Sequence, residues 1–467
     1  MINYKNNIDL VNTLLSSDAI LLQNSGGHFE KIQFSDFQQY LANVANYTFD
    51  DVAFYVDINK ASTTSTSTVV DRGGSSYMQS LWTGMWKMAI MSPSGHFSYL
   101  SGSNNCYTSD GTKVMNYAAG LAADGATAEY HYNLLSSFSN CNVMGQIPKT
   151  YFHAQEITVG SVTFYRLWFS IVAFGNQNII PEQWVGIFKG KVDANGKLRS
   201  IPNAIPTGNK TIYQFWQAAQ LMGTNYGLAN GDFQTQLHAF LFANYGSRDI
   251  QNATKDGSVV FGPSLDGSEN TKASASDGFT RQQGIVTGAT LSLTVQDGNV
   301  GTIDGVGGNV HVSRIGYFEG VYGQYWEMRC GMASLANDAA NNVYLWKTNF
   351  CPSSAPTADT FANIPCQIVT RSTVGNSKWC IGDHLLSCVP TGSGISGIST
   401  GDAFYYDAAG QLWIWGGSSA EASGCGLSYS ASYGGWANSG SDLAARLAFF
   451  GNAVERTGAQ LLSELTA

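Results

Sequence analysis

The sequence predicts an α+β fold in which two central helices are enclosed by many short antiparallel strands. Helical periodicity stands out at only two segments, 212–222 and 232–246, while most other segments alternate like half-buried strands between clusters of Gly, Ser and Asn. Strands therefore do not alternate one by one with helices, which argues against a parallel βα layout. The chain has 467 residues, 12% of them charged and 12% aromatic, against about 25% charged in a typical domain. Such a chain can bury a sizeable core.

The first fifty residues are predicted to form a small separate module. A short helix is expected over 8–15, then a hairpin over 19–34 with its turn at Gly26–Gly27, and a helix capped by Ser35 or Asp36. A β-rich intermediate region over 51–125 follows, with a Ser/Thr-rich linker at 61–70 and an exposed turn after it. Residues 126–467 are predicted to form a third domain, the largest of the chain.

The apolar patterns place the main elements of the two larger regions. A strand pair is expected over 81–99 around Pro93, and further strands over 142–170. The first central helix presents Ile212, Phe215, Trp216, Ala219 and Met222 on one face, and the second presents Phe233, Leu237, Phe240 and Leu241. Asp232 is the predicted cap of the second helix. No further helix is expected after Asn252, and strands are expected over 287–302, 310–329, 366–370, 404–415 and 443–450.

Charge and cysteine usage restrict the possible partners. The net charge of −9 and the lack of a basic cluster argue against nucleic acid or an anionic membrane as the partner. No signal-peptide core and no stretch of about 18 apolar residues occurs, which predicts a soluble chain without membrane insertion. The eight cysteines are scattered and are predicted to be mostly buried free thiols. No metal site and no cofactor is expected.

No catalytic residue is predicted. Residues Gly397 to Gly401 match the Gly-x-Ser-x-Gly pattern of hydrolase nucleophiles, but a strand, not a helix, is expected after them. His238 is predicted to be a packed, hydrogen-bonded side chain on the second helix, because no other histidine lies within four residues of it. The repeated Asp-Gly pairs are interpreted as turns and not as calcium loops.

The segment from Gly416 to Asp442 has the composition of a binding loop. It is rich in Ser, Gly, Tyr and Asn, and its only charges are Glu421 and Asp442. Such residues supply rigid aromatic contact area and adaptable hydrogen bonds. Because apolar strands are predicted on both sides, at 412–415 and 443–450, the loop is expected to be held by the core and not to be a free linker.

The order of several motifs resembles that of phage tail receptor-binding proteins with a C-type-lectin-like fold, the adhesins that include variable proteins of diversity-generating retroelements. The same fold occurs in formylglycine-generating enzymes. Gly320 and Gln324 stand where the family's core strand has Asn residues. The matching segments are Ile20 to Gly27, Val143 to Tyr151, Trp184 to Gly190, Arg314 to Glu327, Ile414 to Ser418 and Ala445 to Ala448.

This resemblance implies a trimeric protein of the virion tail that binds a receptor, glycan or protein, on the bacterial host surface. Its N-terminal module, 1–50, would attach to other tail proteins, and residues 126–467 would form the C-type-lectin-like, ligand-binding domain. Trp436 would be a fixed aromatic contact of the loop, since adenine-directed mutagenesis of an Asn codon does not produce Trp. The variable ligand-binding positions would be Ser418, Ser419, Ser423, Cys425, Ser428, Tyr429, Ser430, Ser432, Tyr433, Asn438 and Ser441.

Two other functions remain open from the sequence. A structural tail-fibre component without a receptor would have the same composition. A formylglycine-generating-type oxidase would share the fold, but it needs two closely spaced C-terminal cysteines for copper, whereas Cys425 stands alone in the loop. The sequence therefore favours a binding protein that is not an enzyme.

Overall fold

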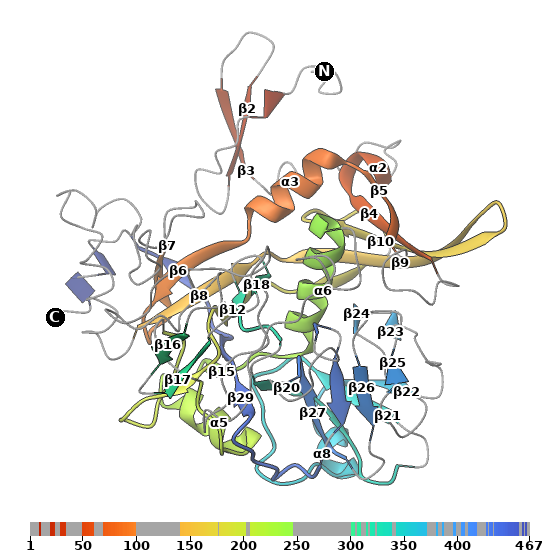
Figure 1. Ribbon diagram of the computed structural model, residues 1–467. Helices are drawn as coiled ribbons and strands as arrows, with labels where there is room; N and C mark the ends of the chain where they lie inside the picture. The colour runs from red at the N-terminus through yellow and green to blue at the C-terminus, as the bar shows by residue number, and fades with distance from the viewer. Residues whose placement is uncertain are drawn as a thin grey trace.

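The computed structural model describes one chain built mostly of strands with few helices, and this mixed composition confirms that part of the sequence prediction (Figure 1). All statements below concern the residues it describes. These are 9–10, 19–23, 29–33, 49–59, 69–99, 141–175, 177–201, 206–245, 300–303, 306–309, 314–315, 318–322, 325–338, 342–370, 380–381, 385–386, 396–397, 403–406, 410–417, 426–427, 429–432, 434–456, 460–461 and 463–464.

The N-terminal hairpin forms where it was predicted. Strands β2 (Ala19–Gln23) and β3 (Phe29–Gln33) pair antiparallel, with Ala19 opposite Gln33. The helix expected over 8–15 is contradicted at its start, because β1 (Asp9–Leu10) is a strand that pairs with β2. The helix expected after Ser35 lies outside the described residues.

A five-stranded sheet in the order β11-β9-β10-β4-β5 combines strands from both sides of the expected domain boundary. Asp57 of β4 receives two hydrogen bonds from Arg166 of β10, at 2.8 and 2.7 Å. The strands are β4 (Phe54–Asn59), β5 (Val69–Gly74), β9 (Thr150–Val159), β10 (Val162–Ser170) and β11 (Asn178–Ile180). The helix α2 (Phe49–Val52) precedes β4.

A seven-stranded sheet, ordered β15-β30-β12-β8-β6-β7-β31, joins still more distant parts of the chain. Its hairpin of β6 and β7 confirms the strand pair expected around Pro93, but the first residues of the expected range, 81–84, are helical. The strands are β6 (Lys87–Met91), β7 (His96–Tyr99), β8 (Asn142–Ile147), β12 (Gln183–Gly186), β15 (Tyr226–Leu228), β30 (Leu447–Phe449) and β31 (Val454–Glu455).

These two sheets correct the predicted division at residue 125. Strands from 54–99 pair directly with strands from 142–170, so the described parts of the 51–125 and 126–467 regions share their sheets. The physical reason is that strand pairing depends on long-range packing, which local composition does not encode. The turn expected after 70 is also wrong in part, since β5 extends to Gly74 and the helix α3 (Ser76–Gly84) begins after its cap, Ser75.

An eight-stranded sheet forms the C-terminal half, in the order β22-β21-β20-β27-β28-β26-β25, with β29 pairing with β20 as well. Its strands are β20 (Trp326–Ser334), β21 (Asn342–Trp346), β22 (Cys366–Thr370), β25 (Ser396–Gly397), β26 (Ala403–Tyr406), β27 (Leu412–Trp415), β28 (Ser430–Ser432) and β29 (Leu443–Ala445). Four small strand pairs complete the list: β13 (Lys191–Val192) with β14 (Leu198–Arg199), β16 (Val300–Ile303) with β17 (Val306–Asn309), β18 (Arg314–Ile315) with β19 (Phe318–Glu319), and β23 (Cys380–Ile381) with β24 (Leu385–Leu386).

Both predicted central helices are present. Helix α5 (Ile212–Gln220) starts at a capping box, in which the Thr211 hydroxyl accepts from the Gln214 amide and the Gln214 side chain accepts from the Thr211 amide. Helix α6 (Gly231–Tyr245) begins one residue before the predicted cap Asp232, because Asn230 accepts the Phe233 amide at 3.3 Å instead. A short helix, α8 (Ala358–Ala362), lies in the part where no helix was expected.

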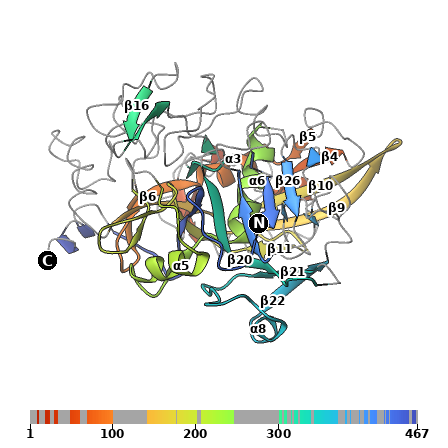
Figure 2. The same cartoon turned by 60° about the horizontal axis from the view of Figure 1, so that its bottom comes forward.

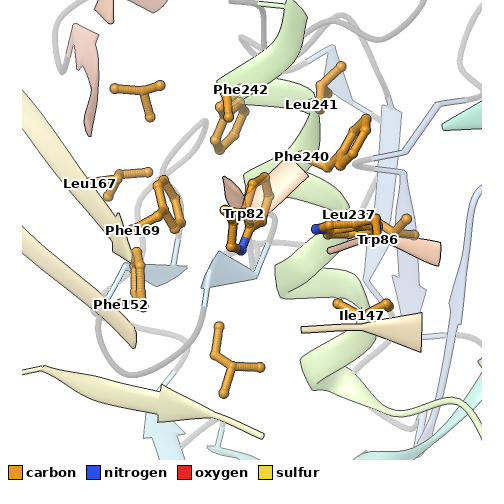
Figure 3. Close-up of a cluster of buried hydrophobic side chains, with 14 of the residues drawn as sticks. Trp82, Trp86, Ile147, Phe152, Leu167, Phe169, Leu237, Phe240, Leu241 and Phe242 are labelled. Carbon is orange, nitrogen blue, oxygen red and sulfur yellow. The ribbon is translucent and has the colours of Figure 1, made fainter. Parts of the chain in front are cut away.

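Helix α6 is buried on all sides, which is the condition of a helix inside a core (Figure 1). Leu237 and Phe240 face Trp82 and Trp86, and Phe152 and Phe169 of the five-stranded sheet complete this cluster (Figure 3). The second core cluster lies beneath α5 and contains Trp184, Trp326, Trp346 and Trp436. The helix α6 therefore packs against strands of both halves of the fold.

Candidate binding loop

The two borders of the predicted loop are buried strands. Strand β27 lies inside the eight-stranded sheet with all four residues buried, and β29 pairs in parallel with β20. The returning part of the loop adds the strand β28, antiparallel to β27 and parallel to β26. The described parts of the segment are thus held by the core, as the sequence predicts.

Tyr429 lies inside the protein and not on a binding surface. Its side chain is 3% exposed, and its ring meets the Trp326 ring edge-on with 4.4 Å between centroids. Its carbonyl accepts the Gly416 amide at 2.8 Å, which ties the middle of the loop to its first residue. The predicted role of Tyr429 as a variable surface contact is therefore wrong for this conformation of the chain.

The same correction applies to three further predicted contacts. Ser430 and Ser432 are 0% exposed because they pair with Trp415 and Trp413 in the interior of the sheet. Trp436 is 3% exposed, and its indole donates to the Pro352 carbonyl at 2.8 Å. Composition suggested contact residues here because Tyr and Trp serve equally well in a core when their polar atoms find partners, and small Ser side chains also fit inside a sheet.

Two predicted positions do lie at the surface. Ser441 is exposed and Asn438 is half-buried, and both belong to the segment 434–442, which follows β28. Gly435, Ala437 and Ser439 in the same segment are exposed as well. The remaining predicted positions lie outside the described residues: Ser418, Ser419, Ser423, Cys425, Ser428 and Tyr433.

A buried charge cluster fastens the loop to the core. Glu327 of β20 accepts from Arg329 at 2.9 Å and from Arg446 at 3.0 Å, and all three side chains are at most 1% exposed. Arg329 also donates to Gln234 of α6, whose amide donates to the Leu427 carbonyl of the loop at 2.7 Å. A continuous chain of hydrogen bonds therefore runs from the loop through α6 to β20.

Arg446 extends the cluster to the opposite sheet. Its guanidinium donates to the carbonyls of Gly186 and Ile187 at 3.0 and 2.6 Å. Phe233 lies beneath both guanidiniums, with its ring centroid 4.9 Å from Arg329 and 5.7 Å from Arg446. The motif residues Glu327 and Arg446 thus have a structural role in joining the sheets.

The electrostatics of Glu327 follow from this enclosure. Burial alone raises the pKa of a carboxyl, but the charges of Arg446, Arg329 and Lys189 outweigh it and lower the Glu327 pKa to about 2. Lys189 itself donates to the Tyr325 carbonyl beside the cluster. Glu327 is therefore ionised at every ordinary pH.

The other predicted side chains are where the sequence placed them, as far as they are described. His238 is 0% exposed and forms a hydrogen bond with Gln234 at 3.2 Å, which confirms a packed histidine. Cys141, Cys330 and Cys351 are buried free thiols, and Cys366 is a half-buried one. The next described residues after Gly397 form strand β26, which pairs with β25 and agrees with the strand expected there.

Two further findings are limited to the residues described above. No group of three His, Cys, Asp or Glu side chains is arranged to hold a metal ion. No helix there is both long and apolar enough to cross a membrane.

Sequence reasoning missed two segments that border 434–442. Asn209, just before α5, donates its amide to the Gly440 carbonyl at 2.7 Å. Pro352 accepts the Trp436 indole, and Pro356 accepts the Gln411 side chain at 3.4 Å. The only sequence signal for the second segment is the cluster of Pro, Ser and Ala over 352–356, which predicts an exposed loop but not its neighbours.

Comparison with known proteins finds no matching family model and no matching curated protein.

Proposed function

We propose that this chain is a receptor-binding protein of a phage tail, a non-enzymatic adhesin with a C-type-lectin-like domain. The observation that carries the proposal is the segment 434–442, where exposed small polar residues are displayed on a rigid base. The base consists of the buried Trp436 and of strands β28 and β29 on either side. A surface that is fixed by the core can bind without a large ordering cost.

The proposed contact residues differ from those that composition alone suggests. Asn438 and Ser441 remain candidates, together with the exposed Ser439 between them. The buried Tyr429 and Trp436 act as supports for this surface. Binding to a bacterial surface receptor, attachment of the N-terminal module to other tail proteins and location in the virion tail all belong to the same proposal.

Adsorption to bacteria tests this function directly. The full chain is labelled with a fluorophore and incubated with a panel of bacterial isolates. Flow cytometry then measures the fluorescence of the protein bound to the cells. Ser439→Arg and Ser441→Arg should reduce binding at least tenfold with an unchanged melting temperature, because they add bulk and charge only at the surface. The control Ser80→Arg alters an exposed position on α3 and should bind normally. Binding to no isolate, or equal binding by all variants, would favour a structural tail component.

A homotrimer is part of the proposal, and the β9–β10 hairpin offers a surface that supports self-association. The hairpin projects from the body in both views (Figures 1 and 2). Near its tip Ile157 pairs with Phe164, and Val159 with Val162, so these four apolar side chains share one face. Val159 is 60% exposed. Beyond Phe164, which still pairs with Asn59 of β4, the described part of the hairpin is a two-stranded tip. Apolar side chains exposed on such a tip favour packing against a second copy.

A further inference from the structure

We propose that the receptor face extends from 434–442 onto helix α5 and the segment 349–356, and that it binds an uncharged saccharide stacked on Tyr213 and Trp216. This inference rests on the proposed adhesin function and specifies both the additional contact residues and the class of receptor.

Hydrogen bonds join the three segments side by side at the same end of the molecule, where Figures 1 and 2 show α5 and α8. Asn209 donates to the Gly440 carbonyl at 2.7 Å, and Trp436 donates to the Pro352 carbonyl at 2.8 Å. A Cβ atom at Gly208 would collide with the Ser441 backbone, so this close approach requires glycine. The segments therefore form one connected surface.

An aromatic pair on α5 gives this surface its chemical character. The rings of Tyr213 and Trp216 stack with 5.6 Å between centroids and 18° between planes. Both side chains are half-buried, whereas Phe215 between them is 0% exposed and faces the core. Both rings also pack against the second core cluster, so the pair lies at the edge of this cluster, with part of its surface open to a ligand.

The orientation of Trp216 is fixed before any ligand arrives. Its indole donates to Asn349 Oδ1 at 3.1 Å, and the Asn349 amide group donates to the carbonyls of Thr224 and Tyr226 at 3.2 and 2.9 Å. Phe350, the next residue, is 37% exposed. A preset aromatic surface loses little entropy on binding, which favours a weakly bound ligand with a flat apolar face, such as the C–H face of a sugar ring.

The charge of the surface selects the class of ligand. Lys210 and Asp442 are the only charged residues of 209–216, 349–356 and 434–442. A saccharide without acidic groups presents apolar C–H faces for stacking and hydroxyl groups for hydrogen bonds with Ser and Asn side chains. A strongly charged polymer would find no complementary field here.

The experiment uses the full chain, an array of neutral and acidic bacterial polysaccharides, and cells of a binding isolate treated with periodate or with protease. Wild type should bind neutral polysaccharides, and adsorption should be lost after periodate but kept after protease. Tyr213→Ala combined with Trp216→Ala should lower polysaccharide binding at least tenfold, while Trp216→Phe should keep part of it. Tyr165→Ala, which removes a half-buried ring from β10, is the matched control for any loss of stability and should bind normally.

The possible results separate the two proposals. Adsorption that survives periodate and is lost after protease would overturn the saccharide inference and leave the adhesin function standing. If the double variant binds polysaccharide as well as wild type does, only the proposed role of α5 is overturned. Failure to bind any cell would overturn both.

Discussion

Arg446 donates its Nε hydrogen to Glu327 Oε2 at 3.0 Å, and neither side chain is exposed to solvent. This pair connects the strand that follows the binding loop to the strand at the centre of the eight-stranded sheet. Because Arg446 also reaches Gly186 and Ile187, one guanidinium holds three segments together. Removing one partner of such a pair leaves a buried charge without its counter-charge.

Replacing Arg446 should therefore destabilise the fold strongly. We expect Arg446→Met to lower the free energy of unfolding by about 3–5 kcal/mol, measured by urea denaturation. The matched control is Lys149→Met, since Lys149 is exposed and its ammonium group lies 4.8 Å from the centroid of the Tyr151 ring. That control should change stability by less than about 1 kcal/mol. Equal effects of the two substitutions would contradict the structural role of the buried pair.

The low pKa of Glu327 predicts a stability change in acid. Its folded-state pKa of about 2 lies below the ordinary value of 4.5, so its contribution is complete above pH 4.5 and is lost as the pH falls towards 2. Urea denaturation of wild type between pH 7 and pH 2 should show this loss. Glu327→Gln should be less stable at pH 7 and should lack this part of the pH dependence. Glu455→Gln, at an exposed position, should follow the wild-type curve.

Because Tyr429 and Trp436 are buried, we expect them to stabilise the fold and not to form surface contacts with a receptor. We expect Tyr429→Ala and Trp436→Ala each to lower the free energy of unfolding by about 3–5 kcal/mol, as for other large buried side chains. Calorimetry should show a lower melting temperature for both. The exposed Ser441→Ala should stay within about 0.5 kcal/mol of wild type. Unchanged melting temperatures for both aromatic variants would show that Tyr429 and Trp436 are surface residues and not part of the core.

Self-association through the hairpin can be tested with two substitutions on opposite faces of one strand. Val159→Asp places a charge on the apolar face, and it should shift the protein towards monomer in light scattering coupled to size-exclusion chromatography. Thr158→Asp places the same charge on the other face, where Thr158 approaches Thr163 at 3.3 Å, and it should keep the oligomer. If the Val159→Asp variant remains oligomeric, or if wild type is a monomer, the hairpin does not mediate self-association.

Local patterns were sufficient for the elements whose own residues decide their structure. Helix α5 forms where its apolar face predicts it, and the β6–β7 hairpin forms around Pro93. Helix α3 was missed because the Gly and Ser residues before it indicated a turn, although Met78 and Trp82 have helical spacing and face the core. The end of α6 was also predicted well, but its cap was not, because Asn230 and Asp232 are both acceptable capping residues.

The sequence by itself determined that this protein has two principal helices among many short strands, a nearly uncharged surface and a loop closed by buried strands. These properties depend on composition and on short-range periodicity. Only the tertiary structure decided which loop residues face the solvent. Tyr429 is covered by Trp326 and Trp436 is bonded to Pro352, and both partners lie far away in the sequence. A Tyr or Trp side chain suits a core and a binding surface equally, so its role depends on which distant residues pack against it.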